Sequence, residues 1–233
     1  MHMNNKIKPF IALFTLAIAS AVAVAGVLDG FTSQQQVGAL KSALTQSAQS
    51  AIGKLGVADG FLGNKEVKIP LPGKLQKAMP ILKMLKLDNR ADELVVAMNR
   101  AAEAAVPEAR ILLTDSVKNM SVTDAVGILS GGPDSATQYF RRTTSEKLAA
   151  KFRPIVTKST EKVGAAKQYN QLAGQLAQYG ILKGDDTSVE GYVTSKALDG
   201  LFTMMAKEEA NIRANPLGQA SSLVKKIFGA LGH

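Results

Sequence analysis

The chain has 233 residues, a formal net charge of +9 and a hydrophobic content of 46%. It contains no cysteine and no tryptophan, and its two histidines are His2 and the last residue, His233. This composition excludes disulfides, thiol catalysis, thiolate metal sites and histidine-based catalytic triads from the folded interior. We therefore expect neither a cofactor nor a metal ion.

The N-terminal 25 residues have the three parts of a secretory signal peptide. Lys6 and Lys8 form a basic region, residues 10–24 are almost entirely apolar, and Ala23-Val24-Ala25 has the small-x-small pattern of a cleavage site. The alternative is an uncleaved membrane anchor, but an apolar run of about 15 residues is shorter than the roughly 20 that span a bilayer. We expect cleavage after Ala25 and a mature chain of residues 26–233.

Apolar residues recur at spacings of three and four along nearly all of the mature chain, which predicts amphipathic helices. Thr32 or Ser33 caps the first helix, and glycines and prolines separate those that follow. The expected helices are 33–55, 73–86 (with Pro80 as a kink or as the true start), 88–106, 107–117, 122–129, 134–156 (with a kink at Pro154), 160–179, 189–214 and 217–231.

Residues 56–73 are the least helical part of the mature chain. Val67, Ile69 and Leu71 alternate with polar residues and prolines, which predicts a short extended arm that Pro70 and Pro72 keep out of a sheet interior. We interpret the arm as a connector across the core; a docking strip for a partner is the alternative. The predicted fold is a single all-α multi-helix bundle of about nine or ten helices with this one extended, proline-bearing arm.

Arg141 and Arg142 follow two adjacent aromatic residues on the helix that begins after Gly131-Gly132. Either arginine presents a bidentate fork to a carboxylate or a phosphate, so these two residues form a candidate anion-binding site. The interpretation that we favour is that they pair with acidic residues inside the protein, and the anion site is the alternative. The candidate partners are Glu103, Glu108, Asp124 and, four residues after Arg142 on the same helix, Glu146.

Acidic pairs are the remaining source of catalysis, because two carboxylates can carry out hydrolysis. The candidates are Glu103 with Glu108, Asp185 with Asp186, and Glu208 with Glu209. Helical acidic residues in a basic protein are usually surface ion-pair partners, so we expect no catalytic residue. The sequence also lacks an EF-hand loop, a nucleotide-binding fingerprint and the alternation of aromatic and basic residues that marks a nucleic-acid surface.

The C-terminal segment, residues 217–231, has an apolar face beside Lys225-Lys226. Leu223, Ile227 and Phe228 belong to that face, and the pattern is typical of a helix on an anionic membrane surface. We favour docking of the segment on its own bundle, and contact with an anionic membrane is the alternative.

Six short motifs resemble a family of exported proteins from Gram-negative bacteria, the domain of unknown function 4197. The motifs are residues 25–31, 59–64, 67–72, 98–105, 131–142 and 196–201. The resemblance extends over essentially the whole mature chain and implies a secreted or periplasmic helical protein. The resemblance implies no particular activity, cofactor or catalytic residue.

We therefore expect a non-enzymatic periplasmic protein that binds a partner protein or an apolar or anionic envelope ligand, and no nucleic acid. A carboxylate-dependent hydrolase or transferase is one alternative. The other is a membrane-surface protein attached through residues 217–231.

Overall fold

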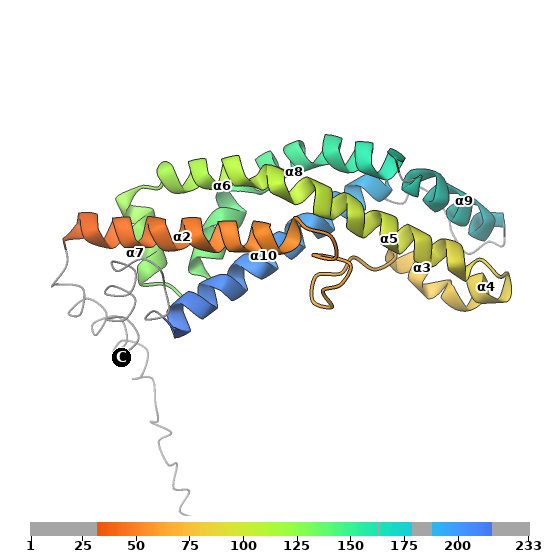
Figure 1. Ribbon diagram of the computed structural model, residues 1–233, viewed down its shortest axis with the longest axis horizontal. Helices are drawn as coiled ribbons and strands as arrows, with labels where there is room; N and C mark the ends of the chain where they lie inside the picture. The colour runs from red at the N-terminus through yellow and green to blue at the C-terminus, as the bar shows by residue number, and fades with distance from the viewer. Residues whose placement is uncertain (1–31, 163, 179–187, 216–233) are drawn as a thin grey trace, which may run out of the picture.

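The computed structural model describes residues 32–162, 164–178 and 188–215 (Figure 1). The expected signal peptide, Asp185-Asp186 and residues 217–231 lie outside these ranges. The described elements are α2 (Ser33–Leu55), α3 (Gly73–Lys77), α4 (Met79–Met84), α5 (Asp88–Ala105), the 3-10 turn η1 (Val106–Glu108), α6 (Ala109–Lys118), α7 (Val122–Leu129), α8 (Ser135–Lys162), α9 (Ala165–Gln178) and α10 (Val189–Ala214).

The described part of the chain contains no strand, which confirms the predicted all-α bundle. None of its helices is long and apolar enough to cross a membrane.

The helices form an elongated bundle in which α10 packs along α8, α2 and α5 (Figure 1). Helices α3 and α4 lie at one end of the bundle, next to the N-terminal half of α5, and α7 lies near the opposite end. One cluster of buried apolar side chains extends from α2 to α10. Alanine supplies much of it, as the scarcity of aromatic residues predicts, and the α5 residues Ala101, Ala102 and Ala105 are fully buried. Small side chains at these positions let neighbouring helices approach α5 closely.

The predicted cap of the first helix at Thr32 is confirmed, and two further helices also begin at capping residues. Thr32 and Gln35 form a capping box at the start of α2, and Ser121 and Asp124 form one at the start of α7. Ser188 accepts a hydrogen bond from the backbone of Gly191 and so caps α10. In each case a side-chain oxygen satisfies a backbone N–H that has no partner within the helix.

Two predicted helices differ from the structure. Residues 73–86 form two short helices, and Pro80, expected to kink this segment or to mark the true start of the helix, lies in the first turn of α4 because it lacks an N–H group. Helix α8 does not end before residue 160 but continues through Pro154 to Lys162, and the break comes at Gly164, whose φ is +68°. The buried side chains of Leu148, Phe152, Val156 and Thr160 follow one another at four-residue spacing, and this uninterrupted stripe holds α8 together across the proline.

The arm packs against the core through the buried Val67, Ile69 and Leu71, and Asn99 of α5 holds its middle. The Asn99 side chain accepts a hydrogen bond from the Ile69 N–H at 2.8 Å and donates one to the Ile69 carbonyl at 2.9 Å. These are the bonds that a neighbouring strand would otherwise supply. The Tyr192 hydroxyl of α10 donates a further bond to the Pro70 carbonyl at 3.1 Å.

Candidate functional site

Arg141, the first of the two candidate anion-binding residues, is directed toward α10. Its guanidinium lies 4.7 Å from the centre of the buried Phe202 ring and 3.5 Å from Asp199 Oδ1. The side chain is nevertheless exposed, so solvent reaches its charged group.

Arg142 is directed toward α7 instead. Its guanidinium lies 3.7 Å from Asp124 Oδ1 and 5.8 Å from the centre of the Tyr139 ring. Asp124 is among the predicted internal partners, whereas the predicted pair with Glu146 does not form. The two arginines thus face different elements. An anion site that uses both of them stays a prediction.

Glu103 of α5 is buried at the centre of a polar cluster. Its Oε1 accepts hydrogen bonds from the Phe61 N–H at 3.0 Å and the Leu62 N–H at 3.1 Å. Arg100 donates to Glu103 Oε2 at 2.7 Å and to Asp59 Oδ1 at 2.8 Å. The bond to Glu103, followed by that to Asp59, raises the pKa of Arg100. We call Asp59, Arg100, Glu103 and the backbone of Phe61 and Leu62 the Glu103 cluster.

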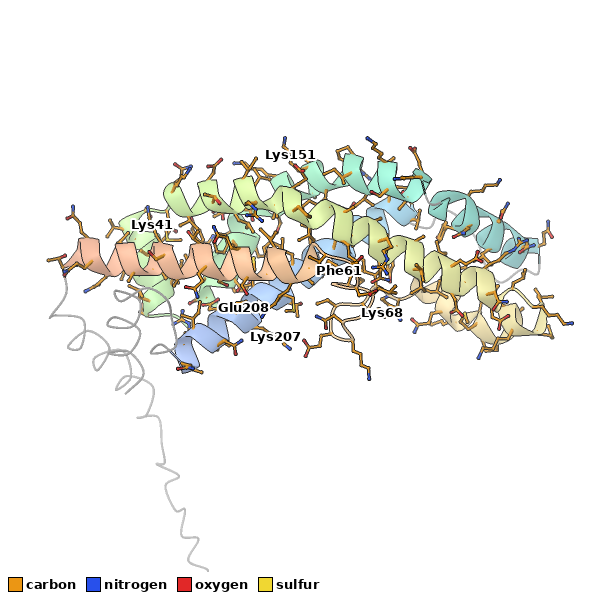
Figure 2. All side chains as sticks on the ribbon, viewed as in Figure 1. Lys41, Phe61, Lys68, Lys151, Lys207 and Glu208 are labelled. Carbon is orange, nitrogen blue, oxygen red and sulfur yellow. The ribbon has the colours of Figure 1, made fainter. Side chains whose placement is uncertain are left out.

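The loop that enters the Glu103 cluster depends on glycine. Asp59 has a φ of +65°, and a Cβ at Gly60 would lie 2.5 Å from the Leu55 carbonyl oxygen. This tight turn places the fully buried Phe61 where α2, α5 and α10 meet (Figure 2). A Cβ at Gly200 of α10 would lie only 2.6 Å from the Phe61 ring, so glycine is required on the facing helix as well.

Glu209 of α10 forms the second buried cluster. Its carboxylate accepts hydrogen bonds from the Ala136 N–H at 3.0 Å and from the Thr137 N–H and hydroxyl at 2.9 Å each. Arg213 donates to Glu209 at 3.0 Å and to the Ile128 carbonyl of α7 at 3.0 Å. These five residues are the Glu209 cluster, which joins α7, α8 and α10. It also satisfies the first-turn N–H groups of α8, so the start of that helix is already capped by a carboxylate.

Glu103 and Glu209 are the only buried acidic residues among those described. Each carboxylate binds backbone N–H groups and an arginine, which is the arrangement of a structural ion pair. Their predicted catalytic partners are placed differently, because Glu108 is exposed and Glu208 pairs with Lys54. Within the described ranges, no three acidic, histidine or cysteine side chains lie close enough to hold a metal ion.

A groove of about 590 Å³ lies between α8 and α10. The two helices run antiparallel, since Thr137 contacts Glu209 whereas Arg141, further along α8, contacts the earlier residue Asp199. We call this feature the α8/α10 groove. Its lining residues are Ser145, Glu146, Ala149, Ala150 and Arg153 of α8, with Gly191, Thr194, Ser195 and Leu198 of α10. Most of these side chains are small, so the two helices leave open space between their outer edges.

Among the polar residues that line the α8/α10 groove, Thr194 and Arg153 lack a partner in the described structure. Thr194 is only 6% exposed, and its hydroxyl oxygen forms no hydrogen bond. A buried polar group without a partner costs about 1–3 kcal/mol. Arg153 is exposed at the rim, and no described acidic residue forms an ion pair with it. The groove therefore offers a ligand one buried hydroxyl and one exposed guanidinium, and the exposed Glu146 carboxylate also belongs to its lining.

A second groove, of about 610 Å³, lies between α5 and α9. Asp92 and Glu93 give it an acidic lining, and Arg100 on its edge is already bound within the Glu103 cluster. This groove does not suit an anion. Of the two, the α8/α10 groove is the better candidate for the expected anionic ligand.

Sequence reasoning did not single out Arg153 or Thr194. The sequence does contain a sign of the groove, namely small residues at four-residue spacing on both helices. On α8, Ser145 and Ala149 precede Arg153 at this spacing, and on α10 Gly191 and Ser195 have the same spacing. Only the antiparallel packing of the two helices shows that these rows face one another.

The fold and its two buried clusters define an all-α bundle protein with a groove between the two longest of its described helices. The chain belongs to the family described as protein of unknown function (DUF4197), whose model matches residues 30–229. This match confirms the resemblance seen in the motifs and includes both clusters and the groove. No curated protein and no solved structure matches the chain.

Proposed function

We propose that this chain is an exported, non-enzymatic binding protein whose α8/α10 groove holds an anionic ligand with an apolar body. The observation that carries the proposal is the buried, unpartnered Thr194 hydroxyl in a groove whose rim holds the unpaired Arg153. An apolar chain would cover Ala149 and Leu198, and its acid group would accept hydrogen bonds from the guanidinium. The groove volume of about 590 Å³ lies within the range of small-molecule sites.

The predicted anion residue Arg141 extends the same row of α8. Arg141, Ser145, Ala149 and Arg153 succeed one another at four-residue spacing and therefore share one side of the helix. An arginine thus stands at each end of this row. Arg141 is partly neutralised by Asp199, so we assign the acid group of the ligand to Arg153.

Thr194→Val is expected to affect binding and stability in opposite directions. The substitution removes the hydroxyl that the ligand uses, so the affinity for a dansyl-labelled undecanoic acid falls about three- to tenfold. It also removes a buried group without a partner, so the free energy of unfolding rises by about 1 kcal/mol. Arg153→Gln is expected to lower the affinity for the same probe about tenfold or more. Probe fluorescence titrations and urea denaturation measure the two effects.

Two matched controls separate the groove from the remaining surface. Thr203→Val changes an exposed threonine on the same helix, and Arg110→Gln removes an exposed arginine from α6. Both are expected to bind the probe as the wild-type protein does. Equal affinity in all variants, or equally tight binding of an uncharged undecanol analogue, would contradict the proposal.

Export is the other part of the proposal, and it is supported by Lys6, Lys8 and the apolar residues 10–24. When the full chain is expressed in a Gram-negative host, we expect protein in the periplasmic fraction that begins at Gly26. N-terminal sequencing measures this directly. Intact chain confined to the cytoplasmic fraction would rule out export.

A further inference from the structure

The α3–α4 tip, which we define as residues 73–87, stands at one end of the elongated bundle (Figure 1). It contains four lysines and no acidic residue, and the nearest acidic residues in sequence are Glu66 and Asp88. All four lysines are exposed, and three of them, Lys77, Lys83 and Lys86, form no ion pair with any described residue. The tip therefore concentrates positive charge, and Lys77, Lys83 and Lys86 carry it without an ion pair to a described residue.

Met84 lies among these lysines with 73% of its surface exposed, more than any other large apolar side chain in the described residues. Its neighbours Leu75 and Leu82 are buried, and α4 packs against α5. The tip is thus attached to the body by its own apolar side chains while Met84 points away from the core. An exposed, flexible apolar side chain within a cationic surface is the combination found in segments that contact membranes.

We propose that the α3–α4 tip binds the surface of an anionic phospholipid bilayer. The lysines would lie at the headgroups, and Met84 would enter the boundary between headgroups and acyl chains. Nucleic acid fits the tip less well, because the exposed large apolar residues of the described part include no aromatic ring on which bases could stack. A polyanionic glycan would use the lysines but leave Met84 without a partner. This inference does not depend on the α8/α10 groove, so either proposal can fail alone.

The absence of tryptophan from the chain gives a direct test. Met84→Trp places a single tryptophan at the tip, and Ile111→Trp places one at a similarly exposed position on α6, where Ile111 is 68% exposed. With vesicles of phosphatidylcholine and about 30% phosphatidylglycerol, we expect the emission of the Met84→Trp protein to shift to the blue by roughly 10 nm or more. The Ile111→Trp protein should show no shift, and vesicles of phosphatidylcholine alone should shift neither.

The contribution of charge is tested in the same Met84→Trp background. Lys77→Glu with Lys83→Glu is expected to weaken vesicle binding at least tenfold, because each lysine near an anionic surface adds to the attraction. Lys147→Glu with Lys151→Glu makes the same change in net charge on α8 and should leave binding within about twofold of the parent protein (Lys151 in Figure 2). All of these side chains are exposed, and thermal melts verify that both double variants remain folded.

Several results would overturn the inference. These are no blue shift at Met84→Trp, an equal shift with neutral vesicles, or an equal loss of binding in the two charge-reversal pairs. Tighter binding to heparin or to DNA than to the vesicles would assign the tip to a polyanion instead. Binding that is abolished by deleting residues 217–231 but unaffected by the Lys77 and Lys83 changes would assign the membrane contact to the C-terminal segment.

Discussion

Replacing Glu103 with alanine lowers the free energy of unfolding by about 3–5 kcal/mol, the range expected when one partner of a buried ion pair is removed. The loss is large because two backbone N–H groups, those of Phe61 and Leu62, would remain buried without an acceptor. Arg100 would keep only its bond to Asp59. The loop that places Phe61 in the core depends on these bonds, so we expect the Phe61 packing to loosen as well.

Urea denaturation followed by far-UV circular dichroism measures the effect. Glu108→Ala is the matched control, because Glu108 is an exposed glutamate five residues further along the chain, and it should change the stability by less than about 0.5 kcal/mol. Glu103→Gln keeps an acceptor for the two N–H groups but loses the charge. Its loss of stability should therefore lie between those of Glu103→Ala and Glu108→Ala. If Glu103→Ala destabilises the protein no more than Glu108→Ala does, the Glu103 cluster does not have the structural role that we assign to it.

Glu209→Ala is the second substitution with a large expected effect, again about 3 kcal/mol or more. It removes the acceptor of the Ala136 and Thr137 N–H groups and leaves Arg213 without its carboxylate. The lost bonds lie at the start of α8, so the first turn of that helix should lose protection from amide hydrogen exchange before the remainder of the helix does.

Glu208 provides the control for Glu209, because it is the adjacent residue and pairs with Lys54 rather than with backbone groups. Lys54 is exposed, and an ion pair with an exposed partner contributes about 1 kcal/mol or less. Glu208→Ala should therefore lower the free energy of unfolding only slightly and should leave hydrogen exchange at the start of α8 unchanged. A similar loss of stability in the two variants would contradict the capping role of Glu209.

The helices could be predicted from the sequence because their signals are local. The capping boxes at Thr32 and Ser121 occupy four consecutive residues each, and the apolar stripes repeat within a single turn. Where local rules failed, packing over a longer range explains the difference. Pro154 is an unfavourable residue inside a helix, yet the buried stripe of α8 continues on both sides of it.

The two buried glutamates show why the polar clusters could not be predicted. Glu103 lies four residues after the buried Asn99 and three before the buried Val106. This helical spacing alone puts Glu103 on the buried face of α5. Sequence reasoning assigned it to the surface because acidic residues are rarely buried. Its partner Phe61 is 42 residues away, and the partner of Glu209, Ala136, is 73 residues away. Only the tertiary fold reveals these acceptor–donor pairs.

The α8/α10 groove, like the two polar clusters, depends on the tertiary fold and could not be predicted from the sequence. Small residues at four-residue spacing are visible on each helix, but the groove exists only because the helices run antiparallel with those residues facing one another. The Thr194 hydroxyl forms no hydrogen bond, although a threonine in a helix often bonds a carbonyl one turn earlier.

Photo-crosslinking tests the central claim, a ligand site in the α8/α10 groove, most directly. A diazirine-bearing fatty acid is irradiated with the full mature protein, and the labelled peptides are mapped by mass spectrometry. We expect labels on residues 145–153 of α8 and 191–198 of α10, and a marked loss of both labels in Arg153→Gln. Labels centred on the α5/α9 groove, or labels that an uncharged diazirine alcohol reproduces equally, would contradict the claim.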